Sequence, residues 1–402
     1  MVKKHELYLK FLLSEILLLG QVTLDPHPDA HLLINQLADK YGYPMEIHEV
    51  ITEDGYILTM QRIPHGRNGT SANLRVALLV HGLLTQAEQF VLQGMYHGSL
   101  AYSMADNGYD VWLANCRGTS HSRKHISYSS KQPQFWNFSF HEIGIYDLPA
   151  KIDYILEKTK KRKIYYVGYS QGGTVFYVMC TERPEYQQKI VMASLMAPSG
   201  LIKRPQFSLG KILTQNHKLI WELIKRYNMY CFPSMKYSLG KIVLSLCVDS
   251  TMTKICSHVL QLAVEIKPTN ITQFQYMWPI MFRFVPRAST KQFVHFFQIA
   301  STEKFRQFDY GTKRNLEIYG KSEPPEYFVE NIAVPIAFYY ALKDNLATYK
   351  DIQEMCGRIL RCEKSSFIHN EDFVHLDFVL SYNLEELVNI PVIRFMEKYD
   401  EN

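Results

Sequence analysis

The serine between glycines in residues 168–172 is the residue whose type and surroundings best suit covalent chemistry. The segment reads Gly-Tyr-Ser-Gln-Gly, with Ser170 at its centre, after an apolar, β-rich run at 164–167. An apolar stretch long enough for a helix follows it. A strand, a sharp turn that carries serine and a helix are the setting in which a G-x-S-x-G motif exposes a nucleophilic hydroxyl. The flanking glycines support this interpretation because side chains would clash in so tight a turn.

A nucleophile of this kind is followed along the chain first by an acid and then by a histidine. Residues 334–341 read as a buried strand, and Asp344 lies just beyond it, where the acid is expected. Asp351 is the alternative, but it falls within a predicted helix at 347–360. We therefore predict that Asp344 is the acid.

Two histidines near the end of the chain compete for the role of base. His369 closes a short strand-like run, 366–369, whereas His375 lies in a loop that leads into an apolar helix. We favour His375, since a loop can bring it over the serine. We interpret His369 as a structural residue that forms hydrogen bonds.

Together these three residues would perform acyl transfer from an ester. His375 would take the proton of Ser170 as the hydroxyl attacks the carbonyl carbon, and would then return it to the leaving alcohol. Asp344 would fix the imidazole tautomer and stabilise its charged form.

The negative oxygen formed in this reaction needs two hydrogen-bond donors. The backbone N–H of Gln171, at the start of the predicted helix, is the first. The second is expected from the loop after an early strand. Residues 75–80 read as that strand, so we predict the backbone N–H of Leu83. His81, in the same loop, precedes the serine and is interpreted as a brace of the loop, not as the base.

The chain resembles the acid lipases of the α/β-hydrolase fold, a family that includes gastric lipase, lysosomal acid lipase and insect relatives. The resemblance implies a mostly parallel central sheet flanked by helices, with an inserted helical cap. It places Ser170, Asp344 and His375 on the family's triad and Leu83 and Gln171 on its oxyanion hole. The matching segments span nearly the whole chain: 41–44, 49–61, 81–84, 107–115, 117–118, 135–144, 146–150, 168–172 and 375–378.

Three departures from the family's pattern bear on substrate preference, not on the catalytic groups. Tyr169 stands where the family usually has histidine, residues 85–90 replace small hydroxyl residues and a tryptophan, and residues 286–289 differ in the cap. The resemblance also implies a disulfide between Cys247 and Cys256. The chain has seven cysteines, so at least one is free, and Cys356 with Cys362 is a second candidate pair.

The length of 402 residues suits one α/β-hydrolase core with an insertion. The alternation of strands and helices breaks at about 201–302, which is rich in aromatic residues, leucine, isoleucine and methionine. We interpret this segment as a cap over the active site, inserted between core segments 21–200 and 303–402. By resemblance the cap contains a lid, which suits esters that do not dissolve in water.

The beginning of the chain has the pattern of a signal peptide. A basic start, Met1 to Lys4, precedes a short apolar run, and we predict that residues 1–20 form this signal. Three N-x-S/T sequons, at Asn68, Asn137 and Asn270, are glycosylation candidates, although Asn137 lies in an aromatic segment expected to be buried. We therefore expect entry into the secretory pathway, with a secreted or lysosomal destination.

Charge and motif patterns argue against nucleic-acid and metal sites. The net charge of +5 is modest, and its densest basic run, 158–163, reads as a solvated helix end before a strand. Cys-x-x-Cys and His-Glu-x-x-His motifs do not occur. The histidine pairs 27/31 and 121/125 fit solvated loops. We expect no metal, no cofactor and no nucleic-acid partner.

The predicted substrates are neutral lipid esters at a lipid–water interface, such as triacylglycerol, with steryl esters also considered. One alternative is a carboxylesterase for small soluble esters. Another is a non-catalytic lipid carrier on the same scaffold, although such a protein is expected to lose its serine, histidine or oxyanion loop. The sequence predicts no oligomeric state.

Overall fold

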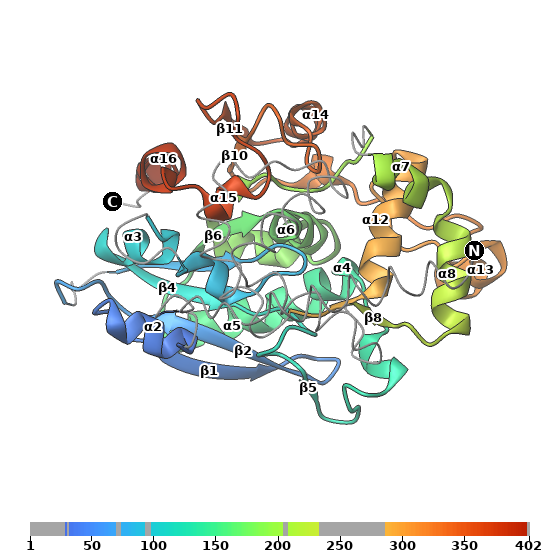
Figure 1. The fold of residues 1–402 in the computed structure, drawn as a ribbon, viewed down its shortest axis with the longest axis horizontal. Coiled ribbons are helices and arrows are strands. Elements are labelled where there is room, and N and C mark those ends of the chain that lie inside the picture. The colour runs from blue at the N-terminus through green and yellow to red at the C-terminus, as the bar shows by residue number, and fades with distance from the viewer. Residues whose placement is uncertain are drawn as a thin grey trace, which may run out of the picture.

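The computed structural model describes residues 29, 32–69, 74–92, 98–203, 208–232 and 286–399. Figure 1 shows a central sheet with helices on both sides. The predicted signal segment 1–20 lies outside the described residues, as do Cys247, Cys256 and Asn270.

Within the described residues, nine strands form the central sheet in the order β1-β2-β4-β3-β6-β7-β10-β11, with β5 also paired to β2. The strand β2 runs antiparallel to β1, β4 and β5, and the pairs from β4 to β11 are parallel. The strands are β1 Glu46–Ile51, β2 Tyr56–Ile63, β3 Arg75–Val80, β4 Tyr109–Ala114, β5 Lys124–His125, β6 Ile164–Tyr169, β7 Ile190–Met196, β10 Ile336–Tyr340 and β11 Cys362–Phe367.

The α-helices connect these strands or follow them along the chain. They are α2 Ile34–Lys40, α3 Leu100–Asp106, α4 Phe140–Glu142, α5 Leu148–Thr159, α6 Gln171–Glu182, α14 Tyr349–Arg358, α15 Asp377–Leu380 and α16 Ile390–Met396. Short 3₁₀ or π-helical segments lie between them: η2 Ala87–Phe90, η3 Pro133–Trp136, η4 Ile143–Asp147, η5 Pro184–Lys189, η6 Val329–Asn331, η7 Glu385–Asn389 and η8 Glu397–Tyr399.

The central parallel strands are buried because helices cover both faces of the sheet. Every residue of β4, β6 and β10 is buried, and their sequences are mostly apolar runs, not alternating patterns; Asp110 of β4 is the charged exception and binds Arg62. The edge strand β1 has no buried residue and carries three charged or ionisable side chains along its length, as expected where one sheet edge faces water. The mainly parallel α/β architecture predicted from the sequence is therefore confirmed.

The described part of the predicted cap forms elements beside the core. These are α7 Ser208–Gln215, α8 His217–Arg226, the small sheet of β8 Cys231–Phe232 and β9 Ala288–Ser289, and α12 Thr290–Thr302. Figure 1 shows α7, α8 and α12 gathered at one end of the molecule, together with α13, Thr312–Tyr319.

A buried ion pair attaches this region to the core. The Nζ atom of Lys291, at the start of α12, lies 3.5 Å from the carboxylate of Glu142 and 2.8 Å from the hydroxyl of Tyr310. Burial alone would lower the pKa of Lys291. The attraction of the neighbouring Glu142 outweighs this effect, so the pKa of Lys291 is raised overall. The pKa of Glu142 is lowered to about 2 despite its burial, because Lys291 is close.

A disulfide joins Cys356 and Cys362, the second pair considered from the sequence. It links the last turn of α14 to the first residue of β11. Cys116 and Cys180 are free and buried, and Cys231 is free and half-buried. Among the helices that the structure describes, none is long and apolar enough to cross a membrane.

Candidate active site

The turn between β6 and α6 holds Ser170 in a conformation that L-residues rarely adopt, with φ 51° and ψ −114°. The surrounding glycines permit this turn because other side chains would collide. A Cβ atom at Gly172 would overlap the carbonyl oxygen of Val80, and one at Gly168 would lie 2.8 Å from the Gly172 backbone. Backbone strain held by close packing is typical of functional turns.

Three side chains predicted from the sequence meet at this turn in one row of hydrogen bonds. The Nε2 atom of His375 lies 2.9 Å from Oγ of Ser170, and Nδ1 lies 2.7 Å from Oδ2 of Asp344. The other oxygen of Asp344 accepts the backbone N–H groups of Leu346 and Ala347, each at 2.8 Å. The carboxylate is therefore fixed from both sides, and the imidazole can transfer a proton from the serine.

The alternative acid and base lie elsewhere. Asp351 is buried in the first turn of α14, where its carboxylate accepts the backbone N–H of Lys203 at 3.2 Å. His369 is exposed just beyond β11, with its ring 4.5 Å from the ring of Phe367. Its exposure does not fit the structural hydrogen-bonding role expected for it, because β11 is an edge strand whose end faces solvent.

Tyr169 contacts the histidine loop, a contact that the sequence did not predict. Its hydroxyl donates to the backbone carbonyl of His375 at 3.0 Å, and the two ring centres are 5.2 Å apart. Burial raises the pKa of Tyr169 well above its ordinary value, so the hydroxyl keeps its proton. The only signal in the sequence is its place next to the serine.

The predicted oxyanion residues flank the serine. Gln171 is the first residue of α6, and Leu83 lies in the loop that follows β3. This loop passes close to the serine, because a Cβ atom at Gly82 would lie 3.1 Å from Cβ of Ser170. Leu84 has a φ of 59°, so the loop turns sharply at a non-glycine residue.

His81 braces this loop, as its position in the sequence suggested. Its Nδ1 atom lies 2.7 Å from the carbonyl oxygen of Gly82, and its Nε2 atom accepts the backbone N–H of Cys116 at 3.0 Å. Burial lowers the pKa of His81 to about 4, which favours the neutral ring. The neutral tautomer with a proton on Nδ1 satisfies both contacts.

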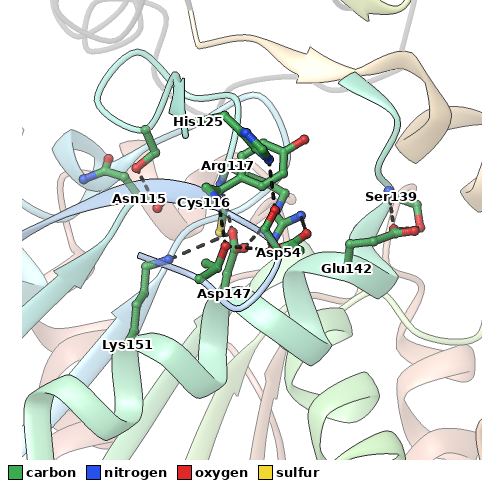
Figure 2. A network of polar contacts seen from close by, with 12 residues as sticks. Asp54, Asn115, Cys116, Arg117, His125, Ser139, Glu142, Asp147 and Lys151 are labelled. Carbon is green, nitrogen blue, oxygen red and sulfur yellow. Dashed lines mark hydrogen bonds and ion pairs between the residues drawn. The ribbon is translucent and has the colours of Figure 1, made fainter. Parts of the chain in front are cut away.

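Behind this loop lies the buried charge network drawn in Figure 2. The guanidinium of Arg117 binds Asp147 at 2.6 Å and Asp54 at 2.5 Å. Lys151 lies 4.0 Å from Asp147, and its pKa is lowered by burial. The network joins the β1–β2 turn, the segment after β4 and the start of α5, and therefore fixes the backbone at Cys116 to which His81 binds.

The other predicted features have ordinary surroundings. His121 binds Glu88 at 2.6 Å, and His125 binds the backbone carbonyl of Asp54 at 2.9 Å. Within the described ranges, no group of three or more His, Cys, Asp or Glu residues could hold a metal ion.

The glycosylation candidates Asn68 and Asn137 are both exposed. Exposure of Asn137 corrects the expectation of burial, because its aromatic neighbours point inward while its own side chain points out.

Models of two protein families match the chain. The model described as a partial alpha/beta-hydrolase lipase region matches residues 34–94, and that of the alpha/beta hydrolase fold matches residues 76–211. Among solved structures, a protein of Sulfolobus solfataricus matches with a TM-score of 0.57 at 16% identity, over 89% of this chain and 95% of that chain. At this identity the match shows the fold alone.

Curated relatives match over almost the entire chain. Lipase 3 of Drosophila melanogaster is 37% identical, over 89% of this chain and 91% of its own length. Lipase 1 of the same organism is 34% identical, over 93% of this chain and 81% of its own length. The gastric triacylglycerol lipase of Rattus norvegicus is 33% identical, over 92% of this chain and 93% of its own length. The chain therefore belongs to the lipase family of the α/β-hydrolase fold that includes gastric lipase.

Proposed function

We propose that the chain is a serine-dependent lipase that hydrolyses carboxylic esters of neutral lipids through an acyl-enzyme intermediate. The observation that carries the proposal is the unbroken row of hydrogen bonds from Ser170 through His375 to Asp344, beside a strained turn. A buried carboxylate that holds the imidazole in one tautomer is what a serine nucleophile needs for activation.

The reaction proceeds in two halves. In the first, Oγ of Ser170 bonds to the ester carbonyl carbon while its proton passes to Nε2 of His375, which then protonates the leaving alcohol as the ester C–O bond breaks. In the second, His375 takes a proton from water as the water oxygen attacks the acyl carbon. The bond between the acyl carbon and Oγ of Ser170 then breaks, His375 returns the proton to Oγ, and the fatty acid leaves. Throughout, the carboxylate of Asp344 accepts a hydrogen bond from the Nδ1–H group of the imidazole and stabilises the imidazolium.

The tetrahedral intermediates in both halves carry a negative oxygen. We assign its two hydrogen-bond donors as the backbone N–H groups of Leu83 and Gln171. The close approach of the Gly82 loop to Ser170 supports the first, and the position of Gln171 at the start of α6 supports the second.

Lipids are the proposed substrate class. Relatives over nearly the full length are named lipases, and one is named a triacylglycerol lipase, so triacylglycerol is the proposed substrate, with steryl esters as a further candidate. Residues 201–302 are proposed as a cap that contains a lid. We also propose a secretory route to the cell exterior or the lysosome, which the apolar run within residues 1–20 and the exposed side chains of Asn68 and Asn137 support.

Covalent labelling tests the nucleophile directly. A fluorophosphonate needs both a nucleophile and a base, so peptide mapping should find the label on Ser170 in the wild-type protein. Ser170→Ala and His375→Ala should abolish labelling, whereas His369→Ala should label at the wild-type rate because this histidine is exposed and its ring lies against Phe367. Equal labelling of His375→Ala and the wild type would refute the proposed base. A protein that folds but takes no label would be a lipid carrier instead.

A further inference from the structure

We propose that Thr85 and Gln89 are positioning residues that aim the backbone N–H of Leu83 at the oxyanion. This inference rests on the proposed function. Both residues belong to the segment 85–90, where the sequence departs from the pattern of its family. Neither touches the reacting atoms. Gln89 binds the backbone of Gly82, and Thr85 acts through its hydrogen bond to Gln89.

Side chains hold both polar groups of the Gly82 backbone. The N–H of Gly82 donates to Oε1 of Gln89 at 3.3 Å, and the carbonyl oxygen of Gly82 lies 2.7 Å from Nδ1 of His81. The hydroxyl of Thr85 lies 2.5 Å from the same Oε1 of Gln89 and 3.0 Å from the Gly82 carbonyl oxygen. The Thr85 hydroxyl has one proton to donate, and it favours the shorter contact, the one to Oε1 of Gln89.

These contacts determine the direction of the Leu83 N–H. The carbonyl of Gly82 and the N–H of Leu83 belong to one planar trans peptide group, in which they point in opposite directions. Fixing the carbonyl toward His81 therefore turns the N–H of Leu83 the other way. Gln89 fixes the preceding peptide group through the Gly82 N–H, so the loop cannot rotate about Gly82 without breaking a buried hydrogen bond.

The Gln89 amide is paired at one end only. Its Nε2 atom is buried and has no hydrogen-bond partner within the described residues. A buried amide with one unpaired end lowers stability, because the lost hydration is not replaced. The contribution of Gln89 therefore comes from its other end, Oε1, which accepts the Gly82 N–H.

The segment that carries Gln89 is anchored independently on its other side. The N–H of Ala87 donates to the side chain of Asn115 at 3.1 Å, and Oε1 of Gln86 accepts the hydroxyl of Ser120 at 2.5 Å. Gln86 is about as buried as Gln89, but its amide oxygen binds Ser120 instead of Gly82. It is therefore a matched control for loss of a buried glutamine from the same turn.

The test compares Gln89→Leu with Gln86→Leu, and Thr85→Val with Thr85→Ser, on a short soluble p-nitrophenyl ester. We expect Gln89→Leu and Thr85→Val to lower kcat about tenfold or more and to change KM less than about twofold, because the oxyanion exists in the transition state and not in the substrate. Thr85→Ser should restore most of kcat, since it keeps the hydroxyl. Gln86→Leu should keep kcat within about twofold.

Binding of an alkylboronic acid supplies a second readout. This compound forms a tetrahedral adduct with the serine and places an oxygen at the oxyanion position, so its inhibition constant should rise in parallel with the loss of kcat. Unchanged boronic-acid affinity, or equal losses in Gln86→Leu and Gln89→Leu, would overturn the inference. If Gln89→Leu does not fold, the Thr85 pair decides. A wild-type protein without serine-dependent turnover would overturn the proposed function and this inference with it.

Discussion

Asp344 is the residue whose surroundings most constrain the proposed mechanism. Its two carboxylate oxygens have separate tasks, since one binds His375 and the other accepts two backbone N–H groups. The second pair of contacts keeps the carboxylate from rotating away from the imidazole. Asp351, seven positions later, has its own backbone partner in Lys203 and cannot replace it.

Replacing Asp344 or Asp351 with asparagine should show which of the two is the acid of the triad. Asp344→Asn should lower kcat by about a thousandfold or more, because an amide favours the wrong imidazole tautomer. Asp351→Asn should change kcat little, although it weakens a buried contact to Lys203. Steady-state hydrolysis of a soluble ester measures both. Similar losses in the two variants would show that Asp344 is not the acid.

Loss of the Tyr169 hydroxyl should loosen the histidine loop. Tyr169→Phe leaves the carbonyl of His375 without its buried donor, so we expect the free energy of unfolding to fall by about 1–2 kcal/mol and kcat to fall severalfold. The control is Tyr186→Phe, whose hydroxyl donates to Asp153 at 2.7 Å and not to a residue of the triad, and which should leave kcat unchanged. Urea denaturation and ester hydrolysis test the pair. A Tyr169→Phe protein with wild-type kcat would contradict the proposed role.

At the scale of elements, the serine turn depends on the close approach of β3, β6 and α6. The end of β3 passes so near Gly172 that a methyl group there would overlap the carbonyl oxygen of Val80. Helix α6 is buried from Gln171 through Cys180, so it cannot move outward to relieve the overlap. The turn is therefore held by the packing of whole elements.

Two glycine substitutions measure this constraint. Gly172→Ala should reduce the free energy of unfolding by about 3 kcal/mol and should also lower kcat, because the overlap involves backbone atoms. Gly357→Ala, in α14, meets nothing within 4 Å and should raise stability by about 0.5–1 kcal/mol, since alanine favours the helix. Denaturant titration of both variants gives the comparison. A tolerated Gly172→Ala would mean that the turn is looser than the structure has it.

The sequence predicted elements best where one local pattern was sufficient. The apolar run 75–80 is strand β3 without any shift, and the predicted helix 347–360 is α14, Tyr349–Arg358. The exposed position of Asn137 could not be predicted, since it depends on which way one side chain points among buried aromatic rings.

The meeting of Ser170, Asp344 and His375 could be predicted from the sequence, because the order of their motifs along the chain reflects the order of strands in the sheet. The contacts that support these three residues could not be predicted. The hydroxyl of Tyr169 meets a carbonyl 206 positions away, and Gln89 meets Gly82 through a turn whose shape depends on the buried contacts of Asn115. Such contacts follow from tertiary packing, for which the local sequence has no pattern.

At the scale of the whole molecule, two buried histidines link stability to pH. Burial lowers the pKa of His81 to about 4 and that of His295 to about 3. His295 stacks on Phe140 at 3.9 Å between ring centres and binds the carbonyl of Arg306 at 2.9 Å. The ionisable groups whose charge acts on these rings are Lys151 and His121 for His81, and His141, Glu142 and Lys291 for His295.

The sign of the effect follows from proton binding. Below about pH 6.5 the unfolded chain protonates these histidines while the folded chain does not, so stability is full above that pH and falls as pH decreases toward the folded pKa values. Between pH 7 and pH 5 each histidine should account for a loss of about 2 kcal/mol. Over this interval Glu142 is ionised in the folded state and mostly ionised in the unfolded state, so it contributes little.

His295→Gln should therefore make stability less dependent on pH. We expect its free energy of unfolding to change by about 2 kcal/mol less than that of the wild type between pH 7 and pH 5. His369→Gln, at an exposed position, should follow the wild-type curve. Chemical denaturation at the two pH values measures this. An unchanged slope in His295→Gln would mean that this histidine is charged in the folded protein.

We expect the protein to be a lipase whose turnover depends on Ser170. The most direct measurement is hydrolysis of an emulsified long-chain triacylglycerol against a short soluble ester, from acidic to mildly basic pH, with Ser170→Ala as control. We predict turnover of the emulsion at a higher rate than the soluble ester, and none in Ser170→Ala. Turnover of the soluble ester alone would instead identify a carboxylesterase, and turnover that survives in Ser170→Ala would contradict the catalytic role of the serine.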